Sequence, residues 1–237
     1  MNDLLRTMLP SPATVGLVGP VALVLGGVTA WAVARVRARG VRVAYTRKLF
    51  HFTIFTAAAA VHATSDLAGT MVFGVVIAAL VLTAVVKGEG NGFYEALARE
   101  TDRPHRTLFI LIPLATTATG GLASALLAGP YAAVGYLAAG WGDAIGEPVG
   151  ARWGRHPYRV PSLAGVPATR TLEGSFAVFL MATAGSTAAL ASLGSAPWWG
   201  GIACGAVAAA AEAVSNHGLD NLTVQIVPSI FAVWLFA

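Results

Sequence analysis

The sequence predicts an all-α, polytopic integral membrane protein, a bundle of about eight (seven to nine) transmembrane helices. Of its 237 residues, 56% are hydrophobic and 11% are charged, whereas an ordinary soluble domain carries about 25% charged residues. A bilayer core of roughly 30 Å takes about 20 apolar residues per helix. The apolar segments that fit this requirement are 13–34, 49–63, 67–86, 108–128, 130–148, 174–193, 197–215 and 222–237.

The basic residues follow these segments in a regular way, which is the third observation behind the predicted fold. Of the 15 Lys and Arg residues, all except Arg6 fall in the first, third and fifth loops between the segments. Because Lys and Arg favour cytoplasmic loops, these loops and the seventh are expected in the cytoplasm, with both termini outside. The same bias favours a retained first helix over a cleaved signal peptide. A bacterial inner membrane is the default location, and the net charge of +4 indicates loop bias rather than nucleic-acid binding.

The connections between the segments are short, so residues 1–237 are expected to form a single membrane-embedded domain. The one cysteine, Cys204, lies inside an apolar segment and has no disulfide partner within the chain. We expect it to be a small buried residue.

Polar residues gather at those ends of the predicted helices that face the cytoplasm. Polar groups are costly inside a bilayer and usually face a bundle interior or a wet cavity. The clusters are Arg47, Lys48 and His51; Lys87 and Glu89; Asp143 and Glu147; Arg170 to Ser175; and Glu212, Asn216, Asp220 and Asn221. The predicted midplane carries little besides Thr116, Thr117 and Thr119, which are expected to bond to their own helix. A site at the cytoplasmic surface is therefore favoured over a transport pathway, which would place polar residues near the midplane.

The stretch GWGDAIGEPVGARWG, residues 140–154, carries two carboxylates at the end of the fifth segment. Residues four apart share a helix face, so Asp143 and Glu147 can project together. Mg²⁺ is typically bound by one or two carboxylates together with substrate phosphates. The glycines at 142, 146, 150 and 154 allow another backbone or a ligand to approach closely. The structural alternative is that the glycines pack helices and the acids pair with Arg152 or Arg155.

Three further clusters suit phosphate chemistry. Arg47 and Lys48 can clamp phosphate oxygens, or they can anchor the helix at the membrane interface. The stretch 170–175 offers a cation, hydroxyls and backbone amides at a helix start, where anions bind; a helix cap is the alternative. Glu212 lies in an alanine-rich helix, where a carboxylate rarely serves packing. His51 suits a structural and a catalytic role equally, and the histidines at 62, 105 and 156 are expected to be structural or solvated.

Four stretches together resemble the membrane-embedded polyprenol kinase family. They are RKLFH at 47–51, GDAIGEPVGARWGRH at 142–156, TRTLEGS at 169–175 and GLDNLTVQIVP at 218–228. The family includes phytol kinase and dolichol kinase, and CTP-dependent diacylglycerol kinase and CTP:phosphatidate cytidylyltransferase are its relatives. The resemblance covers 47–237. The phosphate loop GxxxxGK[ST] and the HRD and DFG motifs of protein kinases are absent, so any phosphoryl transfer would use another architecture.

The resemblance implies transfer of the γ-phosphate of CTP to the hydroxyl of a lipid alcohol at the cytoplasmic membrane face, with Mg²⁺. The alcohol would be phytol, farnesol, geranylgeraniol or a polyprenol. The family's Arg-Lys pair falls on Arg47 and Lys48, and its Gly-Asp motif falls on Gly142 and Asp143. Its Lys-Thr-x-Glu-Gly-Ser element falls on 170–175, with arginine in place of the usual lysine. Its Asp-Asn-Leu-Thr element falls on 220–223, with Gln225 where a proline often follows.

These observations together give three sets of expected site residues. The catalytic residues are Asp143, Lys48, Arg47 and Glu212, with Glu212 or Asp143 as the base for the alcohol. The metal ligands are Asp143, Glu147 and Asp220. The nucleotide-binding residues are Gly142, Gly146, Gly150, Arg170, Thr171, Glu173, Gly174, Ser175 and Asn221.

Three other functions are also consistent with the sequence. A cytidylyltransferase acting on phosphatidate, or a CTP-dependent diacylglycerol kinase, would use the same nucleotide. The cytidylyltransferase relatives tend to carry Ser-Asp where this chain has Gly142, which favours the kinase. A membrane transporter is the alternative outside the enzymes, because small residues suit helix packing and helix motion equally.

Overall fold

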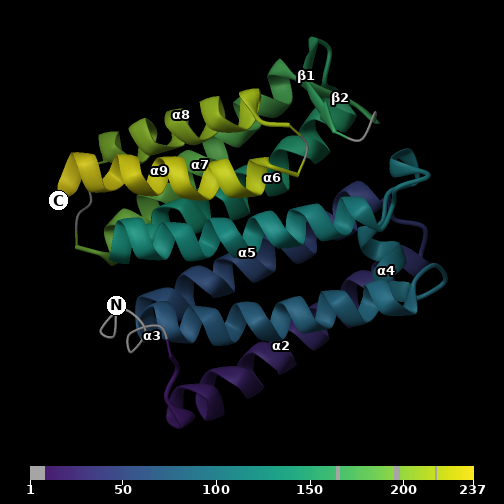
Figure 1. Cartoon of the computed structure of the whole chain (residues 1–237). Coiled ribbons are helices and arrows are strands. Elements are labelled where there is room, and N and C mark those ends of the chain that lie inside the picture. Colours follow the sequence, from purple (N-terminus) through teal and green to yellow (C-terminus); the bar gives the residue numbers. More distant parts are fainter. Residues whose placement is uncertain (1–8, 164–165, 195–197, 217) are drawn as a thin grey trace. The chain divides into compact units, whose positions relative to one another are not determined.

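A computed structural model describes residues 9–163, 166–194, 198–216 and 218–237, and most of them are helical (Figure 1). The helical architecture confirms the main part of the predicted fold. The described residues form two compact units that divide the chain between Ile110 and Leu111. The single domain expected from the sequence stays a prediction.

The first unit consists of a long helix, a second helix that is broken in the middle, and a short connecting segment. Its elements are α2 (Pro12–Ala38), α3 (Val43–Lys87), α4 (Gly92–Leu97) and the 3-10 turn η1 (Glu100–Asp102). Ser11 precedes helix α2, and its hydroxyl accepts a hydrogen bond of 3.0 Å from the Thr14 amide. This is the usual serine cap at a helix N-terminus.

Helix α3 is interrupted at Asp66, where the backbone has φ 51° and ψ −154°. His62 Nδ1 and Thr70 Oγ1 lie 3.1 Å apart across this break. In a straight helix, residues eight positions apart would be separated by about 12 Å along the axis, so the chain turns back here. The break separates the predicted segments 49–63 and 67–86. It also gives His62, which is 5% exposed, the structural role expected for it.

The turn in α3 brings its two ends to the same end of the first unit. There the segment after α3 packs against the end of α2 and the start of α3. Arg37 Nε donates to the carbonyl of Glu95 at 3.3 Å, and Thr46 Oγ1 donates to the carbonyl of Ala96 at 2.8 Å. Arg47, Lys48 and Glu89 therefore lie at one end of this unit, as the charge pattern predicted.

The second unit contains the remaining helices and a small hairpin. Its elements are α5 (Leu108–Ala128), which begins in the first unit, η2 (Gly129–Tyr131), α6 (Ala132–Trp153), β1 (Pro157–Leu163), β2 (Val166–Thr171), α7 (Leu172–Ser192), α8 (Trp198–Val214) and α9 (Asp220–Phe236). Each helix corresponds to one predicted segment within a few residues.

The strands β1 and β2 were not predicted. They pair antiparallel, with Tyr158 opposite Arg170 and Val160 opposite Ala168. Along β1 the partly buried Tyr158 and the buried Val160 alternate with the exposed Arg159. Such alternation is typical of a half-buried strand, but it extends over only a few residues here. The hairpin joins the end of α6 to the start of α7.

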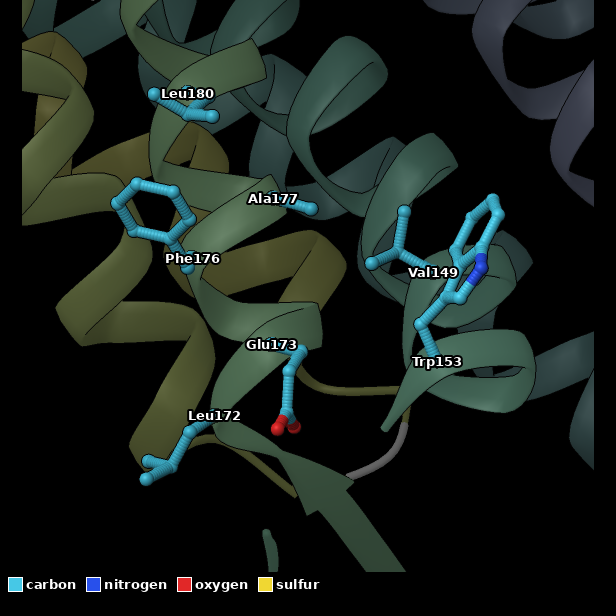
Figure 2. A pocket seen from close by; sticks show the side chains of 7 residues that line it. All are labelled: Val149, Trp153, Leu172, Glu173, Phe176, Ala177 and Leu180. Atoms are coloured by element: carbon cyan, nitrogen blue, oxygen red, sulfur yellow. The ribbon is translucent and has the colours of Figure 1, made fainter. Parts of the chain in front are cut away.

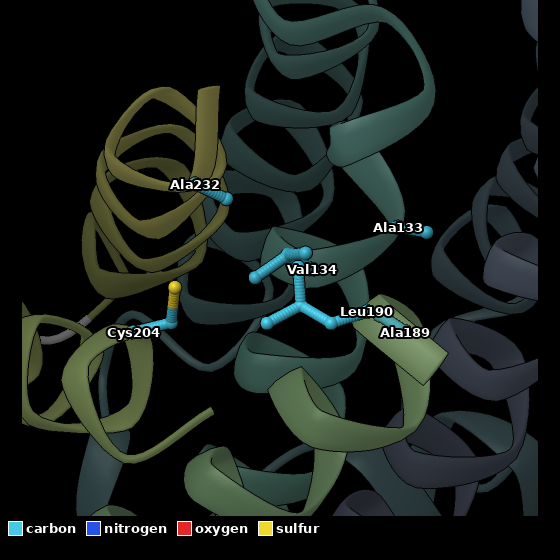
Figure 3. Close-up of a cluster of buried hydrophobic side chains, with 6 residues drawn as sticks. All are labelled: Ala133, Val134, Ala189, Leu190, Cys204 and Ala232. Carbon is cyan, nitrogen blue, oxygen red and sulfur yellow. The ribbon is translucent and has the colours of Figure 1, made fainter. Parts of the chain in front are cut away.

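Small residues allow the helices of the second unit to pack closely. A cluster of buried residues from four helices, α6 to α9, fills its interior (Figure 3): Ala133, Val134, Ala189, Leu190, Cys204 and Ala232. Cys204 has a free thiol and is fully buried. This confirms its expected role as a small packing residue.

Amides and hydroxyls connect α5 to α9. Asn221 Nδ2 donates to Thr117 Oγ1 at 2.9 Å, and Gln225 Nε2 donates to the carbonyls of Thr117 and Asn221. Thr116 Oγ1 donates to the Ile112 carbonyl of its own helix at 2.9 Å, as expected, and also to the Gly218 carbonyl at 2.5 Å. These residues stabilise helix packing, which gives Gln225 the structural role that the sequence did not reveal.

Four stretches of the described chain are long and apolar enough to cross a membrane. They are Pro12–Ala38, Val43–Lys87, Leu108–Trp153 and Leu172–Ser192, while α8 and α9 are apolar but shorter. A polytopic membrane protein is consistent with these lengths. The number of crossings and the side on which each loop lies stay predictions.

Candidate functional site

Arg170 lies at the end of the second unit where the hairpin meets α8 and α9. Its guanidinium forms an ion pair with Glu212 near the end of α8, and Nη2 lies 3.1 Å from Asp220 Oδ2 at the start of α9. Nη2 also donates to the carbonyl of Ser215 at 3.2 Å. The structure therefore brings together three of the residues expected from the sequence, which come from a strand and two helices.

This charged cluster is buried and incompletely paired. The side chains of Arg170, Glu212 and Asp220 are 12%, 7% and 8% exposed. Arg170 Nε, Glu212 Oε2 and the side-chain oxygen of Asn216 are buried without a hydrogen-bond partner. Buried polar atoms normally have partners, and exceptions call for an explanation such as a catalytic role or a bound ligand. A donor and two acceptors at this end of the unit thus have no hydrogen-bond partner among the described residues.

The stretch that leads into α7 has partners for each of its polar side chains. Thr171 caps the helix, because its hydroxyl accepts from the Gly174 amide at 3.1 Å. This confirms the capping interpretation for Thr171 without testing a nucleotide contact. Ser175 Oγ lies 2.6 Å from the Tyr158 hydroxyl. Glu173 Oε1 lies 2.6 Å from His156 Nδ1, and Glu173 Oε2 accepts from the His156 amide at 3.3 Å.

The two carboxylates of α6 lie one helical turn apart on the same element. Asp143 is 8% exposed and Glu147 is half-buried. Among the described residues, no group of three His, Cys, Asp or Glu side chains is close enough to hold a metal ion, and Asp220 is bound to Arg170. A pair of carboxylates nevertheless fits Mg²⁺ that completes its coordination with water and substrate phosphates. The metal ligands therefore stay a prediction.

The glycines of α6 mainly accommodate α7. A Cβ atom at Gly146 would lie 2.4 Å from Val178 Cγ2, and one at Gly150 would lie 2.9 Å from Thr171 Oγ1. On the facing helix, a Cβ at Gly174 would lie 2.9 Å from the Gly146 carbonyl oxygen. The stripe thus permits the close approach of another backbone, which is one of the two roles that the sequence allowed. Contact of Gly142, Gly146 or Gly150 with a nucleotide stays a prediction.

The basic pair at the start of α3 belongs to the first unit. Lys48 is 6% exposed, and the His51 ring stacks on Phe55 with centroids 4.2 Å apart. The contribution of Arg47 and Lys48 to a site in the second unit stays a prediction.

The first unit also contains an ion-pair network that the sequence did not indicate, in the segment between α3 and α5. The Arg106 side chain, 3% exposed, lies 2.7 Å from Glu95 and 3.1 Å from both Glu89 and Glu100. Burial acts to raise the pKa of Glu95, but hydrogen bonds from Arg106 and from the Gly90 amide outweigh it and hold this pKa below its ordinary value. A hydrogen bond from Arg103 lowers the pKa of Glu100. This network stabilises the connecting segment.

The second unit also contains an apolar groove that the sequence did not indicate. It has a volume of about 550 Å³ and is lined by Val149, Trp153, Leu172, Glu173, Phe176, Ala177 and Leu180 (Figure 2). His156, which was expected to be structural or solvated, is 70% exposed and pairs with Glu173, the charged residue of this lining. The sequence of α7 gives no signal for a groove, because its apolar residues are spread over all faces of the helix.

Comparison with known proteins points to one family. No family model matches the chain, and no solved structure matches it. The chain is 32% identical over 115 residues to a phytol kinase from Synechocystis sp. (strain ATCC 27184 / PCC 6803 / Kazusa). The matched region makes up 43% of this chain and 43% of the relative, so it spans less than half of either protein. The similarity supports a family relationship between this chain and the polyprenol and phytol kinases.

Proposed function

We propose that this protein is a CTP-dependent lipid-alcohol kinase. It transfers the γ-phosphate of CTP to the hydroxyl of an isoprenoid alcohol at the cytoplasmic face of the membrane. The observation that carries this proposal is the buried Arg170–Glu212 pair with its unpartnered polar atoms, in a chain similar to a phytol kinase. Apolar helices around a charged cluster suit a substrate that combines a lipid chain with a reacting hydroxyl.

Arg170 has the geometry to bind the nucleotide phosphates. An arginine fork binds phosphate oxygens in the same bidentate manner as carboxylates, so a phosphate can replace one of the carboxylates that Arg170 now contacts. The unpaired Nε offers a further donor. Arg47 and Lys48 would add positive charge around the transferred group, because phosphoryl transfer depends mainly on positioning and charge stabilisation.

Glu212 is our preferred base for the alcohol. Its Oε1 is bound to Arg170, while Oε2 is buried and has no donor. In the proposed reaction this oxygen accepts the proton of the alcohol hydroxyl as the alcohol oxygen bonds to the γ-phosphorus. The bond from the γ-phosphorus to the bridging oxygen breaks at the same time, and CDP leaves with that electron pair. Asp143 is the alternative base.

The paired carboxylates Asp143 and Glu147 would hold Mg²⁺, with Asp220 as a further predicted ligand. When bound, Mg²⁺ neutralises charge on the phosphates of the nucleotide. Asp143 lies among buried residues of α6. A change from aspartate to asparagine there retains shape and removes the charge that a metal ligand needs.

A radiolabel assay tests the proposal. Purified protein in detergent is incubated with γ-labelled CTP, Mg²⁺ and a panel of phytol, farnesol, geranylgeraniol, a polyprenol and diacylglycerol. Label is expected in the lipid phase with an isoprenoid alcohol, and it is expected to disappear in Asp143→Asn. The matched control is Asp66→Asn, an exposed aspartate at the break in α3, where asparagine also tolerates a positive φ.

The same assay separates the alternatives by their products. CDP and a labelled lipid phosphate indicate the kinase, while pyrophosphate and a CDP-lipid indicate a cytidylyltransferase. Transfer of the label to diacylglycerol and to none of the isoprenoid alcohols would identify a CTP-dependent diacylglycerol kinase. No transfer from CTP or ATP to any alcohol, together with movement of a solute into proteoliposomes without nucleotide, would overturn the proposal in favour of a transporter.

A further inference from the structure

The groove between α6 and α7 is apolar along most of its length. Val149 and Trp153 line it from α6, and Phe176, Ala177 and Leu180 line it from α7 (Figure 2). This lining together with Leu172 and Glu173 defines the α6–α7 groove. Its volume of about 550 Å³ lies within the roughly 300–1,000 Å³ that is usual for small-molecule sites.

The position of the groove indicates that its occupant is a lipid chain. Trp153, Phe176 and Leu180 are 59%, 60% and 50% exposed. Both walls belong to stretches that are long and apolar enough to cross a membrane. Large apolar side chains exposed on such helices contact hydrocarbon in a bilayer, so the α6–α7 groove opens to lipid.

One end of the groove carries an acceptor for a hydroxyl group. The Glu173 carboxylate points toward the start of α7, away from Ala177 and Leu180 (Figure 2). His156 occupies one position on each of its oxygens, whereas an ionised carboxylate offers about four acceptor positions. A neutral hydroxyl can therefore donate to Glu173.

We infer that the α6–α7 groove binds the lipid alcohol, with the first part of the isoprenoid chain between its walls. The hydroxyl donates to Glu173 while the alcohol is held there, and it turns to the charged cluster when its proton passes to the base. This inference rests on the proposed function and adds the alcohol-binding part of the site. Glu173 follows Arg170 by three residues, so the polar end of the groove and the charged cluster lie at the same end of α7. Glu173 thereby acts as a positioning residue for the alcohol instead of the nucleotide contact that the sequence indicated.

The length of the groove predicts which part of the alcohol it recognises. The α7 wall from Glu173 to Leu180 spans about 10 Å of helix. The groove therefore holds the part of the chain nearest the hydroxyl, and the remainder extends into the bilayer. Filling the groove should weaken binding of farnesol and of longer isoprenoid alcohols by a similar factor.

Photo-crosslinking tests the inference without requiring catalysis. Farnesol that carries a diazirine near its hydroxyl end is irradiated with the purified full-length protein in nanodiscs, and the labelled peptides are mapped by mass spectrometry. Label is expected on 149–153 and 172–180, with competition by unlabelled geranylgeraniol. Ala177→Phe should reduce this label about tenfold or more. The matched control Ala210→Phe places the same side chain on an exposed position of α8 outside the groove and should keep the label.

Kinetics supply the second measurement. Glu173→Gln retains the shape of the side chain and is expected to raise the KM for the alcohol several-fold while the KM for CTP stays unchanged. Val149→Trp fills the groove from the other wall, should Ala177→Phe fail to fold. A raised KM for CTP in Glu173→Gln, label outside the groove, or equal competition by phosphatidylglycerol would overturn the inference.

The two proposals fail in different ways. A wild-type protein that is labelled in the groove but transfers no phosphate contradicts the proposed function and retains the groove as a lipid-alcohol site. A wild-type protein that transfers phosphate, and whose groove-filled variants have unchanged KM values for the alcohol, contradicts the groove alone.

Discussion

Replacing Arg170 by methionine should destabilise the second unit strongly. Arg170 is the cation shared by Glu212 and Asp220, and all three side chains are at most 12% exposed. Removing one partner of a buried ion pair leaves uncompensated charge and typically costs about 3–5 kcal/mol. For a protein of about 150–250 residues, each kcal/mol shifts Tm by roughly 2–4 °C. The expected decrease in Tm is therefore about 6–20 °C.

Thermal unfolding of the purified protein in detergent measures this effect. Arg159→Met is the matched control, because it removes the same charge from an exposed position of the same hairpin, where surface charges contribute at most about 1 kcal/mol. The double variant Arg170→Met/Glu212→Gln should recover part of the loss, since it removes one of the two unpaired carboxylates. Equal Tm values for Arg170→Met and Arg159→Met, or a double variant no more stable than Arg170→Met, would refute the role assigned to the cluster.

Three further predictions concern packing, pH and the connection of α5 to α9. Gly135→Ala would place a Cβ 1.9 Å from the Gln225 carbonyl oxygen and should cost about 1–3 kcal/mol; Gly74→Ala, with nothing within 4 Å, should be neutral or slightly stabilising, and unfolding curves that rank them otherwise would contradict the packing. Because the folded-state pKa of Glu95 lies below its unfolded value of about 4.5, its stabilisation is present above that pH and is lost as pH falls through the folded pKa. The Tm difference between wild type and Glu95→Gln should therefore shrink on acidification, and a constant difference would exclude this role. Gln225→Leu removes the hydrogen bonds to Thr117 and Asn221. It should lower the free energy of unfolding by about 1–3 kcal/mol and the Tm by a few degrees. An unchanged Tm would show that the amide is dispensable.

The sequence predicted the helices well because their signal is simple. Long apolar segments and alternating basic loops locate helices of a membrane bundle regardless of what each side chain contacts. The break near Asp66 also followed from the pattern, since a polar residue interrupted two apolar stretches. The pattern did not predict the hairpin, because a few alternating residues between Tyr158 and Arg170 cannot be distinguished from a polar loop.

Three of the predicted site residues lie together in the structure, and their function stays a prediction. The topology inferred from the basic loops placed Arg170, Glu212 and Asp220 on the same membrane face, and the structure shows them in contact. The partner of each charged side chain depends on tertiary packing, which a local sequence pattern does not predict. The same holds for the pair formed by Glu173 and His156, two residues that are 17 positions apart.

The dependence of the Arg170 cluster on α9 has a consequence for biosynthesis. The ribosome delivers the hairpin and α8 first, and at that stage Arg170 and Glu212 can pair while the other partner of the arginine is still missing. Asp220 arrives only with the last helix, whose start supplies both the carboxylate and the turn that presents it. The charged centre is thus completed by the final segment of the described chain. A nascent chain that has not yet placed α9 therefore lacks one of the two carboxylates that surround Arg170.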